Sequence, residues 1–201
     1  MDKELKKFLN NVQKELNKNI EGVNIENLKK AVEIILESEK KGGRVHVTGI
    51  GKPGHVAGYI ASLLSSTGTS AYELHGTEAV HGSSGQVKPG DVVIAISNSG
   101  ETEELKPTVK TILANGACLI SCTGNAESWL AKHSEVCLLA RVDKEGDGLN
   151  KPPRASVLSE ILLLQCLSVM LQNKKKLNLN QYVQWHPGGS LGKSIKEMQR
   201  K

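Results

Sequence analysis

Aromatic side chains are scarce in this sequence, which has one Phe, two Trp and three Tyr among 201 residues. Proteins that bind single-stranded nucleic acid without sequence preference stack the bases on aromatic side chains, so the scarcity argues against such a platform. It argues equally against an aromatic groove that stacks on sugar rings. The net charge of +5 comes largely from lysines near the two ends of the chain, which are typical of solvated surface. We therefore expect no nucleic-acid partner.

The sequence also lacks paired cysteines and a long apolar run. Its four cysteines lie inside short apolar segments and none has Cys-x-x-Cys spacing, so free buried thiols in a reducing compartment explain them better than disulfides or zinc. The N-terminus is charged and has no apolar signal region, and no run approaches the roughly 18 apolar residues of a membrane helix. We expect a cytoplasmic protein that binds no membrane.

The segments that are present alternate between helical and strand-like patterns. Residues 2–19 and 25–40 have helical spacing, with Asn24 as a candidate cap and Gly42-Gly43 as the end of the second helix. Five short apolar runs follow, and most are separated by helical segments such as Pro53–Ser66 and Thr102–Asn115. The five runs are Arg44–Ile50, Ser70–Leu74, Asp91–Ile96, Cys118–Cys122 and Glu135–Ala140. This alternation predicts an α/β fold: a three-layer αβα arrangement around a five-stranded parallel sheet of the flavodoxin type.

The last quarter of the chain follows a different pattern. Residues 143–154 form a polar loop rich in Gly and Pro, and Ala155–Leu171 reads as a helix apolar around much of its circumference. Such a helix should be buried, and a subunit interface is one place for it. The length favours a single domain with a core at about 44–193, preceded by the N-terminal helices of residues 1–43.

The most informative stretch is Ser97–Glu104, which follows the third apolar run. The hydroxyls of Ser97, Ser99 and Thr102 could join free backbone N–H groups at the start of a helix and hold an anion, most plausibly a phosphate. The alternative is that Ser99 or Thr102 simply caps the helix. A cap needs one hydroxyl, whereas this turn offers three and a glycine, so we favour the anion site.

A glycine-rich loop follows the first predicted strand. Gly49-x-Gly51-x-x-Gly54 matches a dinucleotide-binding pattern, and Glu73 lies about 20 residues on, where such a site places its ribose-binding acid. Against this, the chain has no room for a full second substrate domain. Two anion-binding turns on adjacent loops also suit a single sugar phosphate, which is the interpretation we favour.

Four further residues have side chains that could together carry out acid–base chemistry. Lys52 lies in the turn after the first strand, Glu104 should lie about one helical turn beyond the phosphate turn, and Glu145 lies in the Gly- and Pro-rich loop. His186 precedes Pro-Gly-Gly near the end of the chain. Each alone is more simply a surface residue. Together they supply a cation, two acids and an imidazole, which suits proton transfer next to a carbonyl and the opening of a sugar ring.

Two histidines, His75 and His81, follow the second strand on either side of Glu78. Their spacing matches no standard zinc motif, so we expect them to contact substrate hydroxyls or an interface and expect no metal.

Taken together, five ordered motifs between residues 44 and 193 resemble the sugar isomerase (SIS) domain family, and within it the arabinose-5-phosphate isomerases most of all. The motifs are Gly49-Ile-Gly51-Lys52-x-Gly54-His55, Ser65-Ser66-Thr67-Gly68-Thr69, Glu78-Ala-Val-His81-Gly82, Ser97-Asn98-Ser99-Gly-Glu-Thr102 and His186-Pro-Gly-Gly-x-Leu-Gly192. The resemblance implies interconversion of an aldose and a ketose 5-phosphate through a cis-enediol, without a redox cofactor. It also implies a homotetramer, a dimer of dimers, with sites shared between subunits.

Carried over residue by residue, the resemblance makes Lys52, Glu104, Glu145 and His186 the catalytic positions. It implies that the substrate and its phosphate are bound by Gly51, His75, His81, Ser97, Asn98, Ser99 and Thr102. One glutamate should move the proton between C1 and C2 while His186 assists ring opening. Which glutamate is the base stays open, with a preference for Glu145 because loops present acids more freely.

The sequence departs from the family pattern in three places. Pro53 replaces a serine beside the phosphate. Pro153–Leu158 replaces a hydroxyl-rich run and brings in Arg154, which either grips the phosphate or is a surface residue. The paired C-terminal CBS regulatory modules of many relatives have no counterpart here. The rival function is a non-catalytic sugar-phosphate sensor, although retention of all four catalytic positions favours an enzyme.

Overall fold

The computed structural model describes residues 2–189, so residues 190–193, the end of the expected core, lie outside the described part. At its centre is a sheet of five parallel strands in the order β2-β1-β3-β4-β5. The strands are β1 (Val45–Gly49), β2 (Ala71–Glu73), β3 (Val92–Ile96), β4 (Cys118–Thr123) and β5 (Val136–Leu139). The five predicted strands and the flavodoxin-type order are confirmed.

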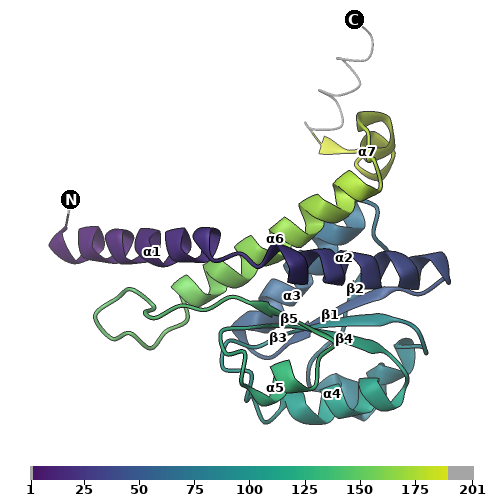
Figure 1. The fold of residues 1–201 in the computed structure, drawn as a ribbon, viewed down its shortest axis with the longest axis horizontal. Helices are drawn as coiled ribbons and strands as arrows, with labels where there is room; N and C mark the ends of the chain where they lie inside the picture. The colour runs from purple at the N-terminus through teal and green to yellow at the C-terminus, as the bar shows by residue number, and fades with distance from the viewer. Residues whose placement is uncertain (1, 190–201) are drawn as a thin grey trace, which may run out of the picture.

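Helices cover both faces of this sheet (Figure 1). On one face lie α2 (Ile25–Lys40), α3 (Lys52–Ser66) and α6 (Ala155–Lys174). On the other lie α4 (Leu105–Ala114), α5 (Trp129–Lys132) and two short 3₁₀ turns, η1 (Glu78–His81) and η2 (Ser83–Gln86). The remaining helices are α1 (Lys3–Glu21) and α7 (Leu179–Trp185). The three-layer α/β fold is therefore as predicted.

The sheet separates two apolar cores. Val45, Val47 and Ile94 point into the core beneath α2, α3 and α6, whereas Val93 and Ala95 point into the core beneath α4. Every residue of β1 and β3 is buried. A strand covered on both faces has no solvent-exposed side, which explains the unbroken apolar run of β3; in β1 the polar residues His46 and Thr48 are buried as well.

The helix boundaries agree with the sequence to within two residues except at the start of α4 and at the end of α6, which continues to Lys174 instead of ending at Leu171. Asn24 caps α2 by accepting a hydrogen bond from the N–H of Asn27, as predicted. The expected helix start at Thr102 is wrong, because α4 begins at Leu105. Gly100 has a φ of +67°, in the left-handed region, and the hydroxyls of residues 97–102 close a turn instead of starting a helix.

The long helix α6 is a core helix on one side only. It lies between α2 and α3, and Leu163, Leu164 and Leu167 are buried against the sheet. Among the described residues it is the one helix long and apolar enough to cross a membrane by length and composition, with a mean hydropathy of 1.6. Half of that stretch is buried inside the fold, and its buried face explains the apolar composition.

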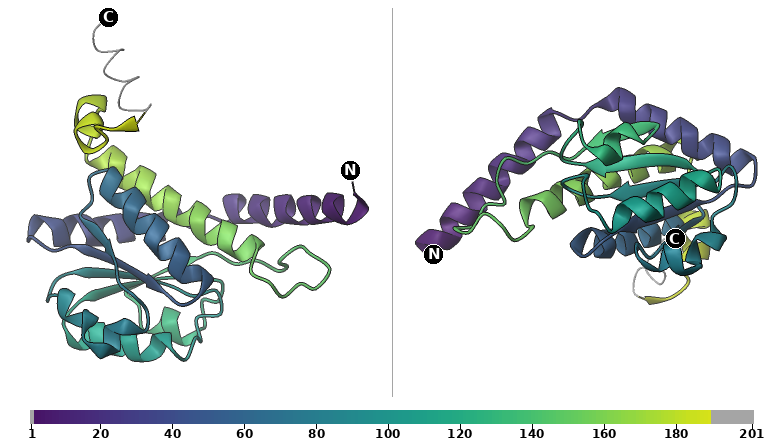
Figure 2. Two further views of the ribbon diagram at one scale, coloured as in Figure 1. Left: turned by 180° about the vertical axis from the view of Figure 1, so that it is seen from behind. Right: turned by 90° about the horizontal axis from the view of Figure 1, so that it is seen from below.

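The first helix, α1, extends away from the body of the molecule beside the loop that joins β5 to α6 (Figure 2). Its side chains bond to that loop. Asn11 Nδ2 donates to the carbonyl of Gly146 at 2.9 Å, and the buried Glu15 accepts from the N–H of Asp143 at 2.9 Å. Gly146 has a φ of +104°, and a Cβ there would lie 3.2 Å from Phe8. The helix and the loop therefore pack as one unit.

All four cysteines are free thiols, as expected from their spacing. Cys122 is fully buried. The other three thiols, Cys118, Cys137 and Cys166, are partly exposed. The prediction of buried thiols therefore holds for one of the four. Burial raises the pKa of the Cys122 thiol well above its ordinary value, so this thiol stays protonated.

Candidate functional site

Most of the predicted site residues lie at one edge of the sheet, where the parallel strands end. In open α/β sheets ligands bind at this edge, at the point where the strand order reverses. Here the chain runs outward from β1 to β2 in one direction and to β3 in the other. The turns after β1 and β3 carry Lys52 and Ser97–Thr102, and they flank that reversal point.

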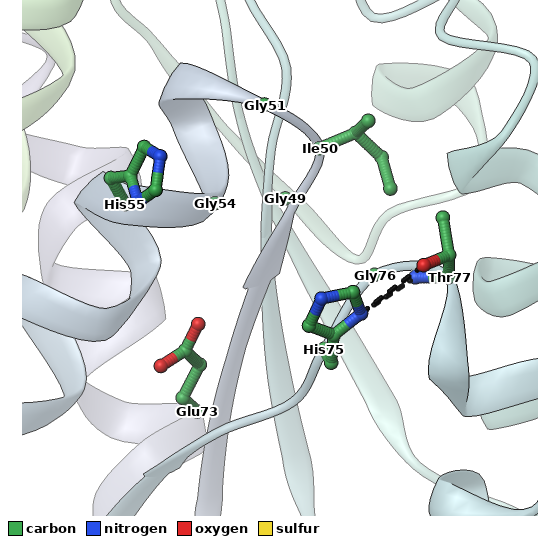
Figure 3. Close-up of a pocket in the computed structure, with 9 residues that line it drawn as sticks. All are labelled: Gly49, Ile50, Gly51, Gly54, His55, Glu73, His75, Gly76 and Thr77. Atoms are coloured by element: carbon green, nitrogen blue, oxygen red, sulfur yellow. Dashed lines mark hydrogen bonds between the residues drawn. The ribbon is translucent and has the colours of Figure 1, made fainter.

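A hollow of about 350 Å³ lies next to the reversal point, between the ends of β1 and β2 (Figure 3). Three titratable side chains surround it: His55 from α3, and Glu73 and His75 from β2 and the loop that follows. Its remaining lining residues are Gly49, Ile50, Gly51, Gly54, Gly76 and Thr77. The three glycines of the Gly49-x-Gly51-x-x-Gly54 pattern and Glu73 therefore line the same hollow. The turn of residues 97–104 is not among its lining residues.

The turn after β1 requires its glycines. A Cβ on Gly49 would lie 2.7 Å from the carbonyl carbon of Pro53, so the strand and the start of α3 could not approach this closely with a larger residue. Gly51 has a φ of +64°. Lys52 is the first residue of α3 and is exposed, and Pro53 fits the first turn, where its missing N–H leaves no bond unmade.

His75 has one ring nitrogen committed and one available. Its Nδ1 accepts from the backbone N–H groups of Thr77 at 3.4 Å and Glu78 at 3.3 Å, and it lies 3.2 Å from the Thr77 hydroxyl. Because Nδ1 acts as an acceptor, the neutral ring carries its proton on Nε2. His75 is exposed and lines the hollow, so its Nε2–H remains available as a hydrogen-bond donor. His81, at the end of η1, is also exposed.

The hydroxyls of the turn after β3 have distinct structural roles. The buried Ser97 Oγ accepts from the N–H of Gly100 at 3.1 Å and lies 2.9 Å from Thr102 Oγ1. Ser99 is exposed, and its Oγ accepts from the N–H of Glu101. The three hydroxyls therefore shape a compact turn that precedes α4 rather than joining its first-turn amides.

Neighbouring loops hold this turn in place. The carbonyl of Asn98 accepts from the N–H of Gly124, and the carbonyl of Gly100 accepts from the N–H of Leu130. Glu104 was expected one turn inside the helix, but that expectation is wrong. It occupies the N-cap position of α4, is exposed and makes no cap bond through its side chain. Because the helix starts later, Glu104 belongs to the same connecting segment as the hydroxyls.

Glu145 is fixed by the start of α6. Its Oε2 accepts from the backbone N–H of Arg154 at 2.6 Å and of Ser156 at 3.1 Å. Helix N-termini have unpaired N–H groups, and the Glu145 carboxylate accepts from two of them at the start of α6. Its own N–H donates to Asn150 Oδ1 at 2.7 Å, and the side chain is half-buried.

Arg154 contacts the β5–α6 loop and α1. Its Nε donates to Asp147 Oδ2 at 3.0 Å, and its guanidinium carbon lies 5.8 Å from the centre of the Phe8 ring. Burial acts to raise the pKa of Asp147, but hydrogen bonds from Asn150 and Arg154 lower it below its ordinary value. The structure therefore gives Arg154 a role that the sequence did not suggest, because its side chain bridges the loop and α1.

His186 lies far from the other three catalytic candidates of the same chain. It is the C-cap of α7, its ring stacks on Tyr182 at 4.2 Å, and its neighbour Trp185 packs on Gly68. Lys175, just beyond α6, also bonds to Gly68, so α7 lies at the C-terminal end of α6. Glu145 lies at the N-terminal end of this 20-residue helix, which is about 30 Å long. Figure 1 shows α7 and the β5–α6 loop at opposite ends of α6.

Sequence reasoning did not single out Glu160, a buried acid of α6. The side chain is 1% exposed, and both carboxyl oxygens lack a hydrogen-bond partner among the described residues. Burial, with a contribution from the charge of Glu145, raises the pKa of Glu160 to about 8. A signal was present in the sequence, because Glu160 is the sole Asp, Glu, Lys or Arg within residues 155–173.

Within residues 2–189, no three His, Cys, Asp or Glu side chains come together as a metal site. The SIS domain matches residues 38–170. The chain belongs to the SIS domain family. The matched residues include the turns after β1 and β3.

Relatives and solved structures agree with the membership. The chain is 39% identical over 170 residues to arabinose 5-phosphate isomerase KdsD of Francisella tularensis, and 42% identical over 166 residues to KdsD of Pseudomonas aeruginosa. The alignments cover 85% and 83% of this chain but 52% and 50% of those proteins, so the chain spans about half the length of these curated relatives.

Among solved structures, one from E. coli CFT073 in complex with arabinose 5-phosphate is 32% identical, with a TM-score of 0.85 over 91% of this chain and 95% of that one. A sugar-phosphate isomerase candidate from Listeria monocytogenes is 30% identical, with a TM-score of 0.84 over 94% of this chain and 100% of that one.

Proposed function

We propose that this protein is an aldose–ketose isomerase that converts arabinose 5-phosphate to ribulose 5-phosphate through a cis-enediol, without a cofactor. The observation that carries the proposal is the fixed carboxylate of Glu145 at the edge of the sheet that also presents Lys52 and the hydroxyl turn. The identity to KdsD proteins and the similarity to a structure in complex with arabinose 5-phosphate support the choice of sugar.

The proposed roles follow from the chemistry of each group. The turn of residues 97–102 binds the phosphate through hydroxyls and backbone N–H groups. Glu145 is the base that removes the C2 proton and returns it to C1, since two backbone N–H groups hold its carboxylate in one position. Lys52 stabilises the negative charge that develops on the enediol oxygen, and Glu104 assists proton exchange at the sugar oxygens. His75 and His81 bind sugar hydroxyls.

His186 enters this scheme only from a second copy of the chain. About 30 Å of helix separates it from Glu145 in one protomer, and hydrogen-bond contact requires about 3 Å. We infer that His186 of a neighbouring subunit assists ring opening at the site formed by Lys52, Glu104 and Glu145. A cytoplasmic homotetramer built as a dimer of dimers, as the family resemblance implies, provides such neighbours.

A panel of phosphorylated sugars tests the proposal. The protein is incubated with arabinose 5-phosphate and with other pentose and hexose phosphates, and the ketose product is measured by a coupled assay. We expect turnover of arabinose 5-phosphate and none by the Glu145→Gln variant. Turnover of another sugar alone would correct the substrate. Binding of sugar phosphates without turnover of any would replace the enzyme with a sugar-phosphate sensor.

A further inference from the structure

Glu160 is an unexplained acid in an apolar helix. Both of its carboxyl oxygens, and the hydroxyls of Ser156 and Ser159, are buried without a hydrogen-bond partner among the described residues. Ser156 and Glu160 are four residues apart, so they lie on one face of α6. Burying an unpaired polar group lowers the stability of the fold, and a buried charge would lower it more. A role outside folding would account for this carboxyl group.

The direction of the side chain relates Glu160 to Glu145. Helical side chains lean toward the N-terminus of their helix, so the Glu160 carboxyl lies over the turn that contains Ser156. The N–H of Ser156 is one of the two that hold the Glu145 carboxylate. The two acids therefore approach the same turn of α6, Glu145 from outside and Glu160 from within.

The two acids lie in different surroundings. Glu145 accepts two backbone N–H bonds, whereas both carboxyl oxygens of Glu160 are buried without a hydrogen-bond partner among the described residues. Glu145 is the charged group that acts on Glu160, and the Cys122 thiol of β4 is its other titratable neighbour. Among the described residues, α1, α2 and α3 contribute no charge that shifts it.

We propose that Glu160 is a positioning residue for Glu145: its uncharged carboxyl beneath the turn keeps the Glu145 carboxylate on the amides of α6. The role in turnover rests on the proposed isomerase function. When Glu160 loses its proton, two negative charges share one helical turn. The Glu145 carboxylate then leaves the amides and the site loses its base.

Carbon-13 NMR of glutamate side chains tests the pairing without substrate. We expect one carboxyl resonance to titrate near pH 8 in the wild type and to vanish in Glu160→Gln. In Glu145→Gln its midpoint should fall, because the neighbouring charge is gone, while the exposed control Glu37→Gln should leave it unchanged. An ordinary midpoint in the wild type, or one that Glu145→Gln does not move, would overturn the proposal.

The pH dependence of turnover tests the consequence. We expect kcat/KM of the wild type to fall above about pH 8, and this fall to be absent in Glu160→Gln and in Glu160→Leu, which serves if the first variant folds poorly. If kcat/KM falls above pH 8 in the same way in the wild type and in the Glu160 variants, Glu160 has no positioning role, and the isomerase proposal is unaffected. If the wild type turns over no sugar phosphate, the isomerase proposal fails, and the NMR titrations still decide whether the two acids are coupled.

Discussion

Glu145 and His186 lie at opposite ends of α6. The carboxylate of Glu145 accepts hydrogen bonds from the N–H groups of Arg154 and Ser156 at the start of the helix. His186 caps α7, whose Trp185 packs on Gly68 beside the other end. The two predicted catalytic residues of one chain therefore cannot act on one substrate, and the proposed mechanism requires two chains.

This separation predicts complementation between inactive variants. Glu145→Gln and His186→Ala should each abolish turnover when pure. When the two are unfolded together and refolded as mixed oligomers, about a quarter of the sites combine an intact Glu145 with an intact His186 from a neighbour. We expect about a quarter of wild-type activity, measured with the coupled assay. A mixture that stays inactive, although light scattering shows mixed oligomers, would place both residues in one protomer's site.

The phosphate turn predicts different effects for its two serines. Ser99 is exposed, so Ser99→Ala should weaken binding of a phosphorylated sugar by about 1–2 kcal/mol with little change in melting temperature. Ser97 is buried and holds the N–H of Gly100, so Ser97→Ala should lower both affinity and stability. Isothermal calorimetry and thermal melts measure the two quantities. Equal loss of affinity for the unphosphorylated sugar would show that the turn does not bind the phosphate.

The protonation of Glu160 predicts an unusual pH dependence of stability. The folded protein keeps this proton up to about pH 8, whereas the unfolded chain releases it near the ordinary carboxyl pKa of 4.5. The folded state therefore holds more protons between these values, and its stability should fall as the pH rises through this window. Over the full window the fall from this residue is roughly 3–5 kcal/mol, since one pKa unit is about 1.4 kcal/mol.

Glu160→Gln should remove that fall. Urea denaturation between pH 5 and pH 8 measures it, with the exposed Glu37→Gln as the matched control. If the variant and the wild type lose stability in parallel over this range, Glu160 is ionised in the folded protein at neutral pH.

The contact between α1 and the β5–α6 loop predicts that α1 supports turnover. Asn11→Ala removes the bond to the carbonyl of Gly146, next to Glu145, and should lower kcat several-fold with about 1 kcal/mol of lost stability. Asn17→Ala, at an exposed position of the same helix, should change neither quantity. Steady-state kinetics and denaturation make the comparison. Equal kcat for the two variants would show that the loop holds Glu145 without help from α1.

The sequence predicted the sheet well because most strands lie in short, largely apolar segments; the central strands β1 and β3 are buried throughout, which leaves little choice of structure. The site was predicted less completely, for two physical reasons. The start of α4 depends on Gly100, whose left-handed conformation directs the hydroxyls into a turn, and composition alone does not reveal that. The distance of His186 depends on how α7 packs on Gly68, which is a long-range contact with no local pattern.

Glu160, which sequence reasoning missed, and Arg154, whose role it left open, show the same limit. The sequence shows Glu160 as an acid in an otherwise apolar helix. Its proposed role depends on Glu145, which approaches the same turn from another part of the chain. Arg154 presented two roles that the sequence left open. Its contact with Asp147 and with the ring of Phe8 comes from the packing of the first helix on a loop far along the chain.

The helix that supports the Glu145 loop lies outside residues 38–170, the stretch by which the family is recognised. Two paralogues with identical residues 38–170 but different N-terminal helices would therefore differ in how strongly the loop that carries Glu145 is held in place. Substitutions in α1 could therefore change the rate of turnover, although a comparison restricted to active-site residues would not include this helix. Grafting the recognised stretch alone onto another protein would transfer the glutamate without the helix that steadies it.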